Sequence, residues 1–127
     1  MGVTAFLHVK LDVADLERAR RFYCDLLSLR PIVRYDRDDG VTILQLSPTG
    51  EPPGVELWYE PPFRPDPGDR LHIAFAVTDL PAVVARIRDS GWPIEREPFR
   101  IGHEQIAFVR DPDGYLIELN EADAAPA

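Results

Sequence analysis

HVKLDVADL at residues 8–16 and HIAFAVTDL at residues 72–80 are two copies of one pattern. Each begins with a histidine, continues as an apolar strand and ends in Asp-Leu, which is typical of a helix start. A glutamate follows later in each half, as Glu56 in Val-Glu-Leu and as Glu118 in Ile-Glu-Leu. The histidines are 64 positions apart (8 to 72) and the glutamates 62 (56 to 118), so a module of about half the chain is repeated.

The periodicity of apolar residues predicts the same order of elements in both modules. Helical spacing covers residues 15–27 and 79–91, where Asp79 is a candidate N-cap and Gly91 a candidate stop. Strands are predicted at residues 8–13, 32–35, 41–46, 55–59, 71–77, 105–109 and 115–120, with one further strand only weakly indicated around residues 93–97. Each module thus has the order strand, helix and three strands, and the fold class is α+β.

Length and composition predict a single domain. A chain of 127 residues that is 45% hydrophobic can bury one core. We expect this domain over residues 1–121, with module one at about 4–60 and module two at about 69–121. The proline-rich residues 60–67 separate the modules, and residues 122–127 are expected to be a disordered tail.

Charge and cysteine content exclude several classes of partner. The net charge is −8 and the basic residues are scattered, which argues against a nucleic-acid partner. We find no apolar run long enough for a signal peptide or a membrane span, so we expect a cytoplasmic protein without a membrane partner. Cys24 is alone, is flanked by apolar residues and is expected to be inert packing. His103 has no counterpart in the other module and is expected at the surface.

The repeated histidines and glutamates predict a metal site. An ionised carboxylate left alone on a buried strand face costs on the order of several kcal/mol. Taken singly, each histidine could be a satisfied core residue and each glutamate a solvent-facing one. The repetition of all four favours a shared partner. If the modules pack with pseudo-twofold symmetry, His8, Glu56, His72 and Glu118 can converge on one divalent cation, whose charge the two carboxylates balance.

Strand alternation also predicts which side chains lie near that site. Residues two positions away from a ligand in a strand lie on the same face as the ligand. The resulting candidates for binding a small-molecule substrate are Lys10, Asp12, Trp58, Glu60 and Asn120. Trp58 could equally be core packing, and Lys10 and Glu60 could be solvated strand ends.

The chain resembles the vicinal-oxygen-chelate superfamily, which includes glyoxalase I, extradiol dioxygenases, and fosfomycin- and bleomycin-resistance proteins. The resemblance runs from His8 to about Glu121 and is most specific in residues 13–16 with 22–23, in residues 72–75, and in FVRDPDGYLIEL at residues 108–119. It implies that the two βαβββ modules form a curved mixed sheet that encloses the metal site. Glyoxalase I is the most similar branch, because all four of its metal-ligand positions match here.

That resemblance implies a metal-dependent lyase or isomerase. Such an enzyme abstracts a proton next to a carbonyl through a metal-bound enediolate, with Glu118 or Glu56 as the base. Its substrate would be the hemithioacetal of a 2-oxoaldehyde and a thiol. The family implies nickel, cobalt or zinc as the cofactor, with iron or manganese also compatible, and a homodimer whose sites are shared between chains.

Two positions depart from the glutathione-dependent pattern, which has an arginine at Asp12 and an asparagine at Glu60. Two acids there would repel the glutathione carboxylates, so the thiol cofactor could differ. Alternatives are another member of the superfamily, such as an epimerase, an extradiol dioxygenase, or an antibiotic-resistance protein that binds a drug or transfers a thiol. These fit less well, because those groups lack a glutamate at Glu56, keep that metal position open, or lack the metal ligands altogether.

Overall fold

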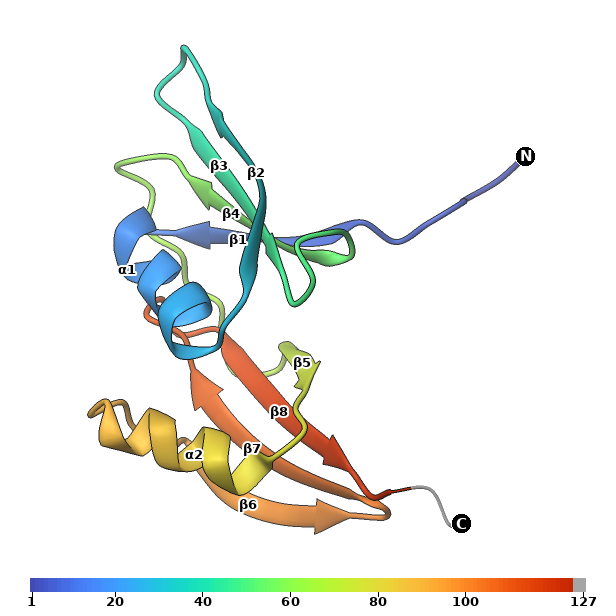
Figure 1. The fold of residues 1–127 in the computed structure, drawn as a ribbon. Helices are drawn as coiled ribbons and strands as arrows, with labels where there is room; N and C mark the ends of the chain where they lie inside the picture. Colours follow the sequence, from blue (N-terminus) through green and yellow to red (C-terminus); the bar gives the residue numbers. More distant parts are fainter. Residues whose placement is uncertain (125–127) are drawn as a thin grey trace. The chain divides into compact units, whose positions relative to one another are not determined.

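The chain divides into two compact units, Met1–Pro65 and Asp66–Ala127. The structure is a computed structural model and describes residues 1–124. The boundary between the units falls inside the proline-rich segment that the sequence predicts to separate the modules. Each unit contains a four-stranded mixed sheet with a helical segment, as Figure 1 shows.

The first unit has the predicted order of strand, helical segment and three strands. Its elements are β1 (His8–Val13), α1 (Leu16–Arg20), η1 (Arg21–Leu26), β2 (Arg30–Asp36), β3 (Thr42–Ser47) and β4 (Gly54–Tyr59). The strand order in the sheet is β1-β4-β3-β2, in which β1 and β4 run parallel and the other neighbours antiparallel. The parallel pair arises because the helical segment carries the chain back across the sheet.

The helix predicted over residues 15–27 has two geometries. Asp15 caps α1 by accepting a hydrogen bond from the backbone N–H of Arg18, and a wider π-helical segment, η1, follows. The buried side chains of this segment include Phe22 and Tyr23, whose rings meet edge to face with centroids 4.9 Å apart. The helical segment ends at Leu26, and Ser28, which follows the C-cap residue Leu27, has a φ of 65°.

The second unit repeats this arrangement. Its elements are β5 (His72–Ala76), α2 (Leu80–Asp89), β6 (Arg96–Ile101), β7 (Glu104–Arg110) and β8 (Leu116–Ala122), in the sheet order β5-β8-β7-β6. Asp79 caps α2 by accepting from the N–H of Ala82, as the sequence predicts. The buried face of α2 consists of Leu80, Val84 and Ile87. The prediction of an α+β fold with two βαβββ modules is therefore confirmed.

One strand in this unit differs from the sequence-based expectation. The strand indicated weakly around residues 93–97 is β6, which begins at Arg96 and extends to Ile101. It lies at the sheet edge, where most of its side chains are exposed, so it lacks the apolar alternation that marks a half-buried strand. At the start of the predicted tail (122–127), Ala122 ends β8 and the N–H of Asp123 donates to the carbonyl of His103. Residues 125–127 lie outside the described residues.

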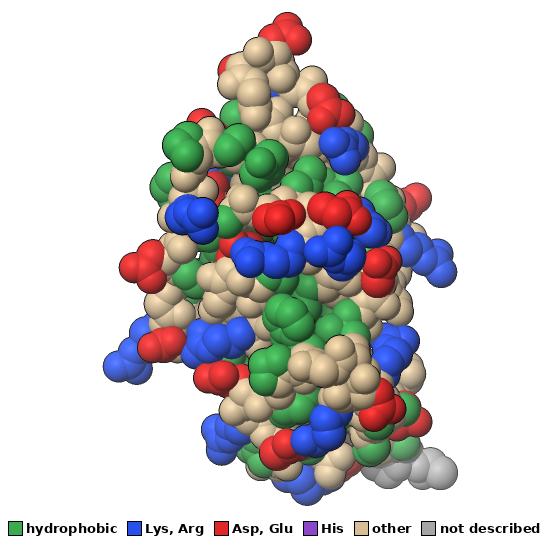
Figure 2. Space-filling view, turned by 90° about the vertical axis from the view of Figure 1, so that its left-hand side faces the viewer, with side chains coloured by type: hydrophobic (Ala, Val, Ile, Leu, Met, Phe, Trp, Pro, Cys, Tyr) green, Lys and Arg blue, Asp and Glu red, His purple; other side chains and the backbone are tan. Residues whose placement is uncertain are grey.

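The surface carries mixed charge. Acidic and basic side chains lie interspersed on the face in Figure 2, in agreement with the scattered basic residues of the sequence. Within residues 1–124 the structure contains no helix long and apolar enough to cross a membrane.

Candidate metal centre

The first histidine–glutamate pair lies on the parallel strands β1 and β4. The register places His8 beside Gly54 and Lys10 beside Glu56, so the glutamate is two residues beyond the partner of the histidine. His8 Nε2 is 3.3 Å from Glu56 Oε2. Glu56 is one of the few buried charged residues, with 8% of its surface exposed. A carboxylate at that depth requires a polar partner, and His8 is one.

The second pair repeats this geometry on the parallel strands β5 and β8. His72 is beside Leu116 and Ala74 is beside Glu118, so the register is the same as in the first unit. His72 Nε2 is 3.3 Å from Glu118 Oε1. Both histidine side chains are more open to solvent (34% and 41% exposed) than their glutamate partners (11% and 13%). Each module therefore presents one imidazole and one carboxylate, and the imidazole is the more accessible of the two.

The donor spacing in both pairs fits ligation of one ion. Transition-metal ligands at about 2.1 Å with angles of 90–110° lie about 3.0–3.4 Å from one another. The observed 3.3 Å between nitrogen and oxygen is within that range in both units. Among residues 1–124 the structure brings no three His, Cys, Asp or Glu side chains together as a metal site. Each unit thus supplies two of the four predicted ligands.

Amide side chains contact both glutamates. Gln45 Nε2 donates to Glu56 Oε2 at 2.8 Å, and Asn120 Nδ2 donates to Glu118 Oε2 at 3.1 Å. Asn120, a predicted substrate residue, therefore has its amide at the second histidine–glutamate pair. Gln45 was missed from the sequence. It lies on β3 directly opposite Glu56, and only the register between β3 and β4 could have identified it.

The other four predicted substrate residues contact one another on the strands of the first pair, β1 and β4, and directly after β4. The Lys10 ammonium is 4.6 Å from the centroid of the Trp58 ring and 3.2 Å from Asp12 Oδ1. Trp58 Nε1 donates to Glu60 Oε2 at 3.3 Å. The Arg37 guanidinium, which the sequence did not indicate, is 5.8 Å from the same ring. The indole is thus surrounded by charged groups of both signs, which is unlike ordinary core packing.

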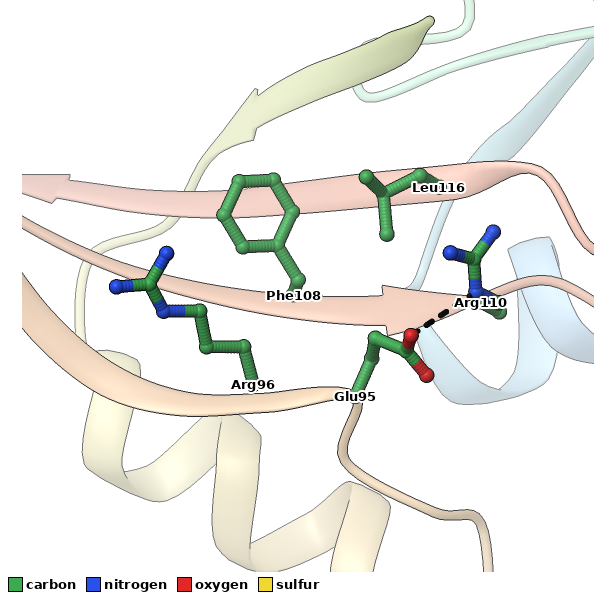
Figure 3. A pocket seen from close by; sticks show the side chains of 5 residues that line it. All are labelled: Glu95, Arg96, Phe108, Arg110 and Leu116. Carbon is green, nitrogen blue, oxygen red and sulfur yellow. Dashed lines mark ion pairs between the residues drawn. The ribbon is translucent and has the colours of Figure 1, made fainter. Parts of the chain in front are cut away.

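A cavity of about 350 Å³ lies in the second unit, lined by Glu95, Arg96, Phe108, Arg110 and Leu116 (Figure 3). Phe108 is opposite Glu118 and Leu116 is beside His72 in the sheet, so the cavity is on the face that carries the second pair. The Phe108 and His72 ring centroids are 5.4 Å apart. No sequence pattern indicated this cavity, because its residues come from three strands.

The two arginine side chains that line the cavity, Arg96 and Arg110, have different surroundings. Arg110 is held by Glu95 at 3.2 Å, by Asp69 at 2.9 Å and by the carbonyl of Gly114 at 2.9 Å. The guanidinium of Arg96 instead stacks on the ring of Phe99, 3.6 Å from its centroid. Arg110 therefore contributes little net charge to the cavity, whereas Arg96 gives it positive character.

Cys24 and His103 are outside the strands that carry the two pairs. Cys24 is half-buried in η1, and burial raises the pKa of its thiol. The His103 side chain is 96% exposed, with Nδ1 3.9 Å from Asp123. These environments agree with an inert cysteine and a surface histidine.

Comparison with known proteins identifies the family. The chain is 37% identical over 122 residues to a probable lactoylglutathione lyase of Synechocystis, covering 89% of this chain and 92% of that protein. It is 35% identical over 126 residues to the lactoylglutathione lyase of Salmonella typhimurium, covering 94% of this chain and 93% of the relative.

Among solved structures, the trypanothione-dependent glyoxalase I of Leishmania major superposes with a TM-score of 0.78 at 32% identity, covering 94% of this chain and 87% of that one. The curated relatives are lyases, which confirms the prediction of an enzyme. Residues 5–119 match the Glyoxalase/Bleomycin resistance protein/Dioxygenase superfamily, and the chain belongs to this superfamily.

Proposed function

We propose that this protein is a metal-dependent lyase of the glyoxalase I type. It would isomerise the hemithioacetal of a 2-oxoaldehyde and a thiol into a 2-hydroxyacyl thioester. The observation that carries the proposal is the repeated histidine–glutamate pair, with the same strand register and the same 3.3 Å spacing in both units. The names of the curated relatives support the same reaction.

The ligand set favours a divalent transition metal such as nickel, cobalt or zinc, held by His8, Glu56, His72 and Glu118. Two neutral imidazoles and two carboxylates compensate the charge of such an ion. When bound, the metal supplies Lewis-acid stabilisation of negative charge on a substrate oxygen.

The glutamates are the candidate bases. The reaction moves one proton from the carbon that carries the hydroxyl and the sulfur to the neighbouring carbonyl carbon, and a second proton from that hydroxyl to the carbonyl oxygen. A carboxylate oxygen of Glu118 or Glu56 can accept the first of these protons and return it to the second carbon. Both side chains are largely shielded from water (13% and 11% exposed), so the proton would be retained between the two transfers.

The side chains around the pairs favour a thiol other than glutathione. Asp12 and Glu60 lie beside Trp58 on the face of the first pair, where they would repel carboxylates of the thiol. Phe108 and Leu116 provide an apolar wall beside the second pair, and Arg96 provides positive charge for an anionic group there. Lys10 and Asn120 complete the set of proposed substrate contacts.

We also propose a homodimer in the cytoplasm, with each site formed by the first unit of one chain and the second unit of its partner. The support is that the repeated histidine–glutamate pairs lie one in each unit and that, among residues 1–124, neither unit brings three such side chains together, so a four-ligand site requires two units. A closed twofold dimer contains two such combinations.

The proposal is tested by metal analysis and by assays of methylglyoxal with several thiols. Wild-type protein should contain about one metal ion per four-ligand site and should form thioester. His72→Ala should lose metal because one of four ligands is gone. Glu118→Gln should retain most of the metal and lose most of the turnover if Glu118 is the base, and Glu56→Gln provides the matched comparison. Metal-loaded protein that forms no thioester with any thiol would contradict the proposed reaction.

A further inference from the structure

The two histidine–glutamate pairs are alike in themselves and differ in what lies opposite them. In the first unit the residue opposite Glu56, on β3, is Gln45. In the second unit the residue opposite Glu118, on β7, is Phe108. The repeat is therefore broken at the position that contacts the ligand pair most directly across the sheet.

Gln45 holds the carboxylate of Glu56 from a neighbouring strand. Its Nε2 is 2.8 Å from Glu56 Oε2, the same oxygen that lies 3.3 Å from His8 Nε2. The β3–β4 ladder fixes the backbones of both residues, so this hydrogen bond restricts rotation of the carboxylate about its last bond. Asn120 provides a weaker constraint on Glu118, because it lies two residues away on the same strand and its hydrogen bond measures 3.1 Å.

Phe108 acts on the other member of its pair. Its ring meets the imidazole of His72 edge to face, with centroids 5.4 Å apart and an interplanar angle of 80°. The first unit therefore orients its carboxylate by a hydrogen bond, and the second unit packs an aromatic ring against its imidazole.

We propose that Gln45 is a positioning residue that orients the Glu56 carboxylate for metal ligation, an inference that rests on the proposed function. A neutral amide suits this role, because it donates a hydrogen bond without neutralising the negative charge that the metal requires. Loss of such an outer partner typically lowers metal affinity about 10–100-fold.

The test is the affinity of purified protein for Ni²⁺ or Zn²⁺ alone, measured by calorimetry without substrate. Gln45→Met removes the donor at nearly constant size and should weaken binding about 10–100-fold. Gln105→Met is the matched control. It makes the same change on β7 opposite Glu121, on the sheet face away from Glu118, and should leave affinity within about twofold. Gln45→Asn keeps the amide on a side chain that is one methylene shorter, so it should also weaken metal binding. It is the alternative variant if Gln45→Met does not fold.

A spectroscopic readout separates orientation from general stability. At saturating Co²⁺, Gln45→Met should change the visible absorption of the bound ion relative to wild type, whereas Gln105→Met should not. Binding of Ni²⁺ or Zn²⁺ by folded Gln45→Met within about twofold of wild type, with an unchanged Co²⁺ spectrum, would overturn this inference alone. Wild-type protein that takes up none of the three metals would overturn the proposed function and the inference together.

Discussion

Complementation between two damaged chains tests whether each metal site draws its ligands from two subunits. One variant carries His8→Ala and Glu56→Ala and so lacks the first pair. The other carries His72→Ala and Glu118→Ala and lacks the second pair. Because each pair lies within one unit, each variant loses two ligands while the other unit keeps its own pair.

The expected recovery follows from this division of the ligands. After the two variants are unfolded together in equal amounts and refolded, about half of the dimers contain one chain of each kind. In a mixed dimer with shared sites, one site lacks all four ligands and the other has all four. One site in two is therefore intact in half of the dimers, which gives about one quarter of the wild-type number of sites.

The assay is elemental analysis after equilibration with Ni²⁺ and removal of free ion. The controls are each variant refolded alone and the two variants mixed after separate refolding, which allows little exchange of subunits. Recovery of thioester formation in the co-refolded sample would follow the metal content. Metal content of the co-refolded sample no higher than the mean of the separately refolded variants would refute shared sites, since sites built within one chain are all damaged.

Three further predictions concern stability, reactivity and specificity. Gly54→Ala should lower the free energy of unfolding by about 1–3 kcal/mol, because the added Cβ would lie 2.0 Å from the carbonyl oxygen of Leu46; an unchanged denaturation curve would contradict this. Because burial raises the pKa of Cys24, iodoacetamide should alkylate the native protein more slowly than the unfolded chain at pH 7, and faster as pH rises; equal rates would oppose it. Because of Asp12 and Glu60, glutathione hemithioacetal should be a poor substrate; a kcat/KM near about 10⁸ M⁻¹s⁻¹ would argue against that reading.

The proximity of each histidine to a glutamate could be predicted because it depends on local pattern. A histidine that opens a strand and a glutamate inside a later strand recur at nearly equal spacing, and strand alternation gives them a common face once those two strands are neighbours. The helix starts at Asp15 and Asp79 were predictable for the same reason, since a cap depends only on the first turn.

Features that depend on strand register or on the sheet edge could not be predicted. Gln45 reaches Glu56 only because β3 and β4 pair with those residues opposite, and nothing in the residues around Gln45 specifies that pairing. The edge strand β6 carries Arg96 and Glu97 with little alternation, because its outer side meets solvent. The cavity combines side chains from β6 to β8 and from Glu95 just before β6, which come together only when these strands pair, so no local pattern indicates it.

The positions where the modules differ are candidates for recognising an asymmetric substrate. The histidine–glutamate pairs repeat with the same register, so under the proposed function the pairs by themselves would distinguish little between the two ends of a substrate. A hemithioacetal has a thiol part and an aldehyde-derived part, which differ in charge and shape. Trp58 in one module stands where Asn120 stands in the other, two residues after each glutamate, and Gln45 stands where Phe108 stands. If the proposed function holds, substrate orientation depends on these unrepeated residues. Exchanging them between the modules should then change specificity more than metal binding, except at Gln45.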